Sequence, residues 1–260
     1  MSKNSRKIIV SAAAAIALTG IAAHDVSAKP APKAPKASVV LVHGAFATAA
    51  SWDKVADILR KKGITVATVD NPLTSLADDV SATKAVLAKQ TGPVVLVGHS
   101  YGGVVIGEAG DDPKVKSLVY VAAFGLDKGE SIQTVSAGSP PPAGIQALRP
   151  DAAGNLLVDP AQFPTVFAGD VEASEAQKMA AGQLATSPTI FAATSTVAAW
   201  HVKPTYYVVS SNDQMIPPQA EAFFAQRMKA TTITLPASHA VMVSEPDKIA
   251  DLIMKAVEAK

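Results

Sequence analysis

The sequence predicts an α/β fold built on a doubly wound, mainly parallel sheet of about six strands, with helices on both faces. Short runs of β-branched residues recur along the chain, and most are apolar throughout, as in strands that are covered on both faces. Helical periods of apolar residues separate these runs, and strands that alternate with helices pair in parallel. Hydrophobic residues make up 48% of the 260 residues and charged residues 17%, as in globular proteins.

Each expected element has its own signal. Apolar stripes at helical spacing predict the first two helices: Trp52, Val55, Ile58 and Leu59, then Leu76, Val80 and Leu87. A third stripe, from Ile249 to Val257, predicts a C-terminal helix, and Ser244 and Asp247 have the spacing of a capping box at its start. The expected strands are Ser38–Val42, Ile64–Val69, Pro93–Val97, Leu118–Val121, Thr205–Val209 and Thr231–Leu235.

One stretch, about 127–199, interrupts this alternation and is predicted to be a small helical lid. It contains seven prolines and no convincing strand, and helical patterns occur only near 171–184 and 189–197. A long insertion between core strands is usually a lid or a binding region. Four residues are expected to form its apolar underside: Phe163, Phe167, Leu184 and Phe191.

The first 28 residues have the pattern of a secretory signal peptide. A basic start is followed by an apolar run from Ile8 to Ala23 and by a small-x-small ending at residues 26–28. Residues 29–37 read KPAPKAPKA and predict a stiff, exposed linker. The domain should therefore occupy 38–260, in a protein exported to the periplasm or secreted, without a stable membrane span after processing.

Composition excludes several classes of function. The chain has 23 basic and 22 acidic side chains, a net charge of +1, so nothing favours nucleic-acid binding. It has no cysteine, which excludes disulfides, iron–sulfur clusters, thiolate zinc sites and cysteine nucleophiles. We expect no metal site.

The clearest chemical motif is Gly98-His99-Ser100-Tyr101-Gly102, a G-x-S-x-G sequence between an expected strand and an expected helix. A serine hydroxyl is a poor nucleophile, and the sharp strand-to-helix turn places it where a base can reach it. The helix N-terminus adds a backbone N–H group and a positive dipole end for a developing oxyanion. This context predicts that Ser100 is a catalytic nucleophile.

A serine nucleophile needs a histidine and an orienting acid at the same edge of the sheet. Of the five histidines, His239 follows the last strand and precedes the final helix, so it lies at a carboxyl end, as Ser100 does. Asp213 follows the expected strand Thr205–Val209. It completes the chain order Ser, Asp, His, which is typical of hydrolases whose serine lies on a strand-to-helix turn. The rival acid is Asp127, which lies six residues beyond the strand ending at Val121.

The loop after the first strand is expected to supply the second oxyanion donor. In His43-Gly44-Ala45-Phe46, the glycine allows the backbone to turn its N–H groups inward. We expect the N–H of Ala45, or alternatively of Phe46, to join that of Tyr101.

These motifs resemble the α/β-hydrolase superfamily, and its compact branch of plant methyl esterases, hydroxynitrile lyases and small bacterial serine hydrolases. The matching segments are LVHGAF (41–46), SW (51–52), VGHSYGG (97–103) and YVAAF (120–124), together with the regions of Asp213 and His239. The resemblance covers roughly residues 38–260. It implies an α/β-hydrolase fold, no cofactor and a small-molecule substrate, and it places Asp213 at the position of the branch's usual acid.

The resulting interpretation is a serine carboxylesterase that acts on small neutral apolar esters through an acyl-enzyme. Two alternatives stay open: a cofactor-free lyase or peroxidase on the same scaffold, and a non-catalytic binding protein that kept the fold. Hydroxynitrile lyases of this branch carry a lysine directly after the catalytic histidine, whereas Ala240 follows His239 here. Lys128 or Lys203 could still supply a cation from elsewhere in the fold.

Overall fold

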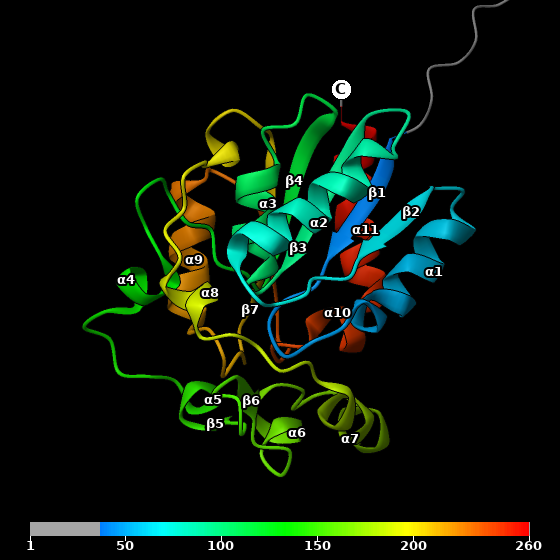
Figure 1. Cartoon of the computed structure of the whole chain (residues 1–260). Helices are drawn as coiled ribbons and strands as arrows, with labels where there is room; N and C mark the ends of the chain where they lie inside the picture. Colours follow the sequence, from blue (N-terminus) through cyan, green and yellow to red (C-terminus); the bar gives the residue numbers. More distant parts are fainter. Residues whose placement is uncertain (1–36, 260) are drawn as a thin grey trace, which may run out of the picture. The chain divides into compact units, whose positions relative to one another are not determined.

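A central sheet of six parallel strands, in the order β2-β1-β3-β4-β7-β8, confirms the predicted fold class (Figure 1). The computed structural model describes residues 37–259. The observed strands lie where the sequence predicts them, and their ends differ from the expected ones by at most three residues. They are β1 (Ser38–Val42), β2 (Val66–Val69), β3 (Val94–His99), β4 (Val115–Val121), β7 (Thr205–Ser210) and β8 (Thr231–Leu235).

The predicted signal peptide, 1–28, lies outside the described residues. The predicted linker, 29–37, does so as well, apart from Ala37, which is buried directly before β1. Within residues 37–259, none of the helices has the length and apolar character needed to cross a membrane.

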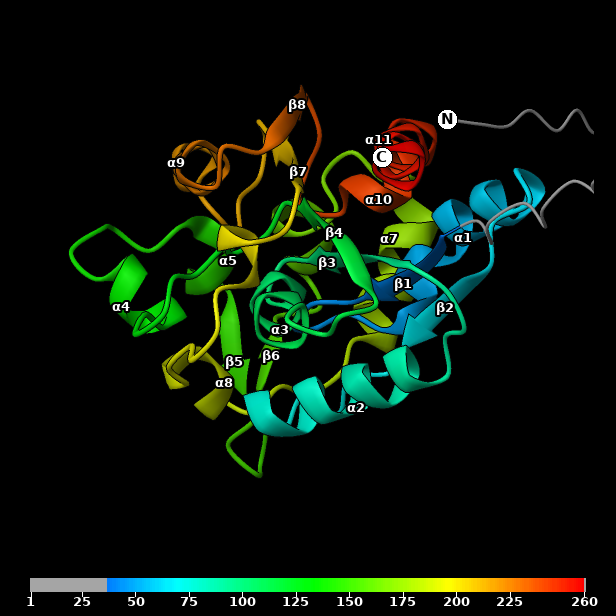
Figure 2. The same ribbon diagram turned by 90° about the horizontal axis from the view of Figure 1, so that it is seen from above.

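Helices cover both faces of the sheet. On one face α1 (Asp53–Lys61) packs against α11 (Pro246–Glu258), and on the other α2 (Leu76–Ala88) packs against α3 (Gly102–Ala109) (Figure 2). Helix α9 (Pro218–Arg227) contacts β7. Every residue of β1 and β3 is buried because helices lie on both sides, whereas the edge strand β8 has exposed and half-buried residues.

The caps of two helices show how local sequence does and does not decide helix ends. Ser75 caps α2, because its hydroxyl accepts the backbone N–H of Asp78 at 3.1 Å. The capping box predicted at Ser244 is wrong. Ser244 ends a separate short helix, α10 (Val241–Ser244), and its N–H donates to the carbonyl of Ala240 at 3.3 Å. Glu245 is therefore the N-cap of α11, without a side-chain hydrogen bond.

The segment between β4 and β7 contains short helices and a small antiparallel hairpin, most of which lie beyond one edge of the sheet (Figure 1). The hairpin was not predicted, because three-residue strands are too short to show a period. Asp151 shapes its turn by accepting the N–H groups of Ala153 and Asn155 at 2.8 and 2.9 Å. The elements are α4 (Ile132–Ser136), α5 (Ala143–Gln146), β5 (Leu148–Pro150), β6 (Leu156–Val158), α6 (Phe163–Val166), α7 (Ala173–Gly182) and α8 (Thr189–Ala192). The segment ends with a 3-10 helix, η2 (Ala199–His201), just before β7, and a second 3-10 helix, η1 (Ala49–Trp52), precedes α1.

The apolar underside expected for this inserted segment is partly wrong. Phe163 and Phe167 are fully buried and stack on each other, with ring centroids 4.5 Å apart. Leu184, by contrast, is 38% exposed. Leu184 follows the end of α7, so the helical stripe that suggested an inward position does not reach it.

Candidate active site

Ser100 lies on a strained turn between β3 and α3. Its φ is 54°, a left-handed value that a residue with a side chain rarely adopts. Glycines allow the turn, because a Cβ at Gly98 would overlap the backbone of Gly102, and a Cβ at Gly102 would lie 2.7 Å from the carbonyl oxygen of Val42. The tight strand-to-helix turn expected from G-x-S-x-G is therefore present, with Ser100 at its tip.

Asp213 and His239 form a buried pair at the carboxyl ends of β7 and β8. His239 Nδ1 lies 2.5 Å from Asp213 Oδ2, and both side chains are at most 1% exposed. The other carboxylate oxygen, Oδ1, accepts the N–H groups of Met215 at 2.6 Å and Ile216 at 2.9 Å. Because a carboxylate only accepts hydrogen bonds, Nδ1 carries a proton and Nε2 is left as an acceptor.

His99 connects the turn that carries Ser100 to the loop that carries His239. Its Nε2 lies 2.9 Å from the backbone carbonyl of His239, so Nε2 carries the proton and donates it. The two imidazole rings are 4.6 Å apart between centroids. Burial lowers the pKa of His99 well below its ordinary value, and the ring is neutral. This hydrogen bond brings the residue directly before Ser100 into contact with His239.

His43 orients the loop that follows β1. Its Nδ1 donates to the carbonyl of Gly44 at 2.9 Å, and its Nε2 accepts the N–H of Asn71 at 3.0 Å. Burial lowers the pKa of His43, which matches this neutral form with one donor and one acceptor. The ring therefore fixes the loop that follows β1.

The inserted segment between β4 and β7 also contacts the loop that carries His239. These contacts were not predicted from the sequence. Asp170 accepts both the hydroxyl and the N–H of Ser238, the latter at 3.1 Å. The carbonyl of Phe167 accepts the N–H of Ala240 at 3.0 Å, and its ring meets His239 edge-on, with centroids 4.8 Å apart. No sequence signal marks Asp170, because it lies 68 residues from Ser238 in an irregular stretch.

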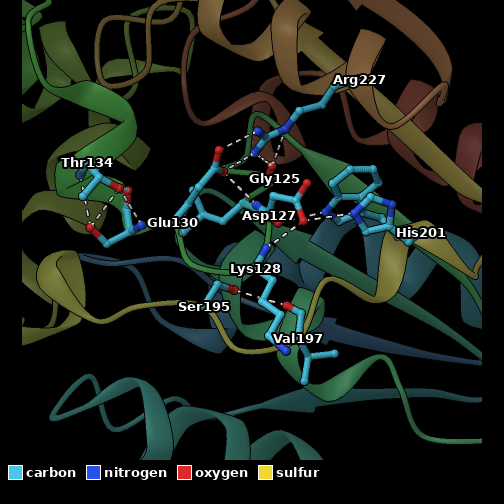
Figure 3. A network of polar contacts seen from close by, with 12 residues as sticks. Gly125, Asp127, Lys128, Glu130, Thr134, Ser195, Val197, His201 and Arg227 are labelled. Atoms are coloured by element: carbon cyan, nitrogen blue, oxygen red, sulfur yellow. Dashed lines mark hydrogen bonds and ion pairs between the residues drawn. The ribbon is translucent and has the colours of Figure 1, made fainter.

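The rival acid, Asp127, pairs with a different histidine. Its Oδ1 contacts His201 Nε2 at 3.0 Å (Figure 3), and both side chains are exposed. The neighbouring Glu130 accepts the N–H of Asp127 and forms an ion pair with Arg227 at 2.7 Å. Asp127 thus belongs to a surface network, whereas Asp213 contacts His239.

The expected oxyanion donors lie on two loops beside Ser100. The N–H of Phe46 donates to the hydroxyl of Thr186 at 3.2 Å, which disfavours Phe46 as the oxyanion donor. For the N–H groups of Ala45 and Tyr101, the structure records no acceptor within residues 37–259. The side chain of Tyr101 is held separately, because its hydroxyl donates to Asp79 at 2.7 Å.

A cavity of about 470 Å³ opens in front of Ser100, within the size range of small-molecule sites. The described residues that line it include no lysine, arginine, aspartate or glutamate. Gln133, Ser136 and Ser139 supply polar groups besides Ser100. The larger apolar side chains include Phe46, Phe124, Ile132, Ile145, Phe191 and Phe224. Of the underside expected from the sequence, only Phe191 lines this cavity.

A strained serine, a buried aspartate–histidine pair and a helix-flanked parallel sheet together define a hydrolase scaffold of the kind that the sequence resembles. The sequence matches the alpha/beta hydrolase family over residues 39–252, and the chain belongs to this family.

Individual relatives support this membership. A carbendazim hydrolyzing esterase of Nocardioides sp. is 34% identical over 120 residues, which are 41% of this chain and 50% of that protein. A pyrethroid hydrolase of Sphingobium wenxiniae is 27% identical over 248 residues, which are 85% of this chain and 88% of that protein. The structure of a methylesterase from Arabidopsis has the same fold, with a TM-score of 0.69 at 19% identity over 85% of this chain and 98% of that one.

Proposed function

We propose that the protein is a serine carboxylesterase that hydrolyses small neutral apolar esters through an acyl-enzyme. The observation that carries the proposal is the buried pair of Asp213 and His239, at the sheet edge where Ser100 faces an uncharged apolar cavity. In this proposal Ser100 is the nucleophile, His239 the general base and Asp213 the orienting acid.

The first half of the reaction forms the acyl-enzyme. Ser100 attacks the ester carbonyl while His239 Nε2 takes the hydroxyl proton, and Asp213 stabilises the imidazolium that results. The N–H groups of Ala45 and Tyr101 receive the oxyanion, and each such donor contributes about 3–4 kcal/mol. His239 then donates its proton to the leaving alcohol. In the second half, water is activated by the same imidazole and releases the acid.

The cavity supports the neutral, apolar character of the substrate. A charged substrate would lose its hydration there without meeting an opposite charge, which is costly. Two relatives point the same way, since their names describe an esterase that hydrolyses carbendazim and a hydrolase of pyrethroids.

The cyanohydrin lyase alternative needs a cation beside the leaving cyanide. No lysine is among the described residues that line the cavity. Lys203, one of the two lysines considered from the sequence, donates instead to the carbonyl of Val115 at 2.7 Å, at the start of β4 and away from the carboxyl edge.

The purified protein should hydrolyse p-nitrophenyl esters of short and medium acyl chains and leave mandelonitrile uncleaved. Release of p-nitrophenol and of benzaldehyde measures the two reactions, and a fluorophosphonate probe should label Ser100. Cyanide release that depends on Ser100, without any ester hydrolysis, would establish the lyase instead. Absence of both turnover and labelling would indicate a binding protein.

We also propose that the protein is exported to the periplasm or secreted, on the strength of the N-terminal sequence pattern alone. Cleavage after Ala28 should leave Lys29 as the first residue of the product recovered outside the cytoplasm. N-terminal sequencing checks this result. A membrane-bound product that still begins at Met1 would contradict it and indicate a retained anchor.

A further inference from the structure

Glu221 is an acidic residue in the first turn of α9, and its complete burial is unusual. Its side chain is fully buried, which is rare for glutamate unless a cation pairs with it. Within residues 37–259, no ion pair with a lysine, arginine or histidine involves Glu221. A charged carboxylate without a partner cation is costly to bury. The question is therefore whether Glu221 is charged or protonated.

The contacts of Glu221 lead to the acid of the proposed triad. Oε2 accepts the N–H of Ser210 at 2.9 Å, at the end of β7, and the carbonyl of Ser210 accepts the N–H of Asp213 at 3.2 Å. No N–H or O–H donor from residues 37–259 reaches Oε1, although this atom is buried. The Glu221 and Asp213 carboxyl groups interact at close range, and both residues hydrogen-bond to the peptide groups of Ser210. Two carboxyl groups can share a hydrogen bond only when one of them is protonated.

The surrounding donors indicate which carboxyl holds the proton. Asp213 receives three N–H donors: Met215 and Ile216 at Oδ1, and His239 at Oδ2. Among the described residues, Glu221 receives only one, from Ser210. Hydrogen bonds from donors stabilise the charged form, so the negative charge belongs on Asp213 and the proton on Glu221.

The electrostatic surroundings agree with this assignment. Burial raises the pKa of Glu221 well above its ordinary value, and the neighbouring Asp213 raises it further. Tyr207 of β7 also interacts with Glu221, and its hydroxyl donates to the carbonyl of Ala123. Burial raises the pKa of Tyr207, and the negative charge of Asp213 raises it further, so Tyr207 is neutral as well.

We propose that Glu221 is a protonated carboxylic acid whose hydrogen bond to Asp213 holds this carboxylate in place beneath His239. Glu221 is then a positioning residue: it touches neither substrate nor serine, and it acts through Asp213. The positioning role rests on the proposed function, whereas the location of the proton does not.

Infrared spectroscopy tests the proton without any turnover. At neutral pH the wild-type protein should show a carbonyl-stretch band of a protonated carboxylic acid, and this band should be absent from Glu221→Gln. The matched control is Glu108→Gln, because Glu108 is also buried but both its oxygens accept hydrogen bonds, among them the hydroxyls of Ser195 and Thr196. That variant should keep the band. A spectrum of Glu221→Gln identical to that of the wild type overturns the assignment.

Kinetics tests the positioning role. Glutamine retains both a donor for Asp213 and an acceptor for Ser210, so Glu221→Gln should keep kcat within about threefold. Glu221→Ala removes the donor and should lower kcat by about 10- to 100-fold with KM unchanged. The acidic limb of the pH profile is the pH range in which kcat falls as the pH is lowered. Because glutamine and a protonated glutamate are both neutral, this limb should lie at the same pH in Glu221→Gln as in the wild type.

Two results would overturn the positioning role. If Glu221 were ionised, Glu221→Gln would remove a negative charge near His239 and move the acidic limb to lower pH. A loss of kcat in Glu221→Gln as large as that in Glu221→Ala, with both variants folded, would also overturn it. Should Glu221→Ala fail to fold, Glu221→Gln and the infrared band still decide. If the wild type hydrolyses no ester, the proposed function fails, and the band still locates the proton.

Discussion

Replacing Ser100 with alanine should lower kcat for ester hydrolysis by about 10⁶-fold, to the residual rate that binding and the oxyanion hole supply. The fold should remain intact, because within residues 37–259 the structure records no hydrogen bond of the Ser100 hydroxyl, and alanine fits the same turn. Hydrolysis of a p-nitrophenyl ester and the thermal unfolding midpoint measure the two effects.

The matched control for this variant is Ser136→Ala. Ser136 also lines the cavity but lies on α4, in the inserted segment. This control should change kcat by no more than about threefold, because the hydroxyl takes no part in bond making. A Ser100→Ala protein that retains a tenth or more of wild-type turnover would show that another group is the nucleophile.

Replacing Asp213 with asparagine should lower kcat by about 10⁴-fold, the loss expected when the orienting acid of a triad is neutralised. The local contacts explain the loss. The N–H groups of Met215 and Ile216 will select the amide oxygen, so the amide NH₂ faces His239. Nδ1 must then accept, which places the imidazole proton on Nε2, and Nε2 can no longer take the proton of Ser100.

The comparison variant is Asp127→Asn, which should change kcat by less than about twofold. Asp127 and its partner His201 lie on the surface, where a single hydrogen-bonded ion pair contributes at most about 1 kcal/mol to stability. Steady-state kinetics of both variants on one ester decides between the two acids. A crippled Asp127→Asn beside a nearly normal Asp213→Asn would reverse the assignment.

The strands and the serine turn were predictable because their signals are local. β1 and β3 are apolar runs at the centre of the sheet, and the motif around Ser100 needs only a strand before it and a helix after it. Chain order and placement at the carboxyl edge favour Asp213 and His239, and the structure brings these two side chains into contact.

The features that escaped prediction depend on long-range contacts or on very short elements. Asp170 and Ser238 meet across 68 residues, and Glu221 approaches Asp213 only because α9 packs against β7. The predicted capping box failed at Ser244 because the short helix α10 occupies that residue, which no periodicity indicated. The G-x-S-x-G motif gave no sign that the ring of His99 reaches the backbone of His239.

The contacts of Asp170 and Phe167 divide the inserted segment into two parts with different freedom to vary in evolution or engineering. The stretch around α6 bonds to the loop of His239, so a changed sequence there would disturb the proposed chemistry itself. Helices α4, α5 and α8 supply cavity residues such as Ile132, Ile145 and Phe191. Libraries that aim at new substrates should therefore randomise these three helices and keep residues 167–170 unchanged.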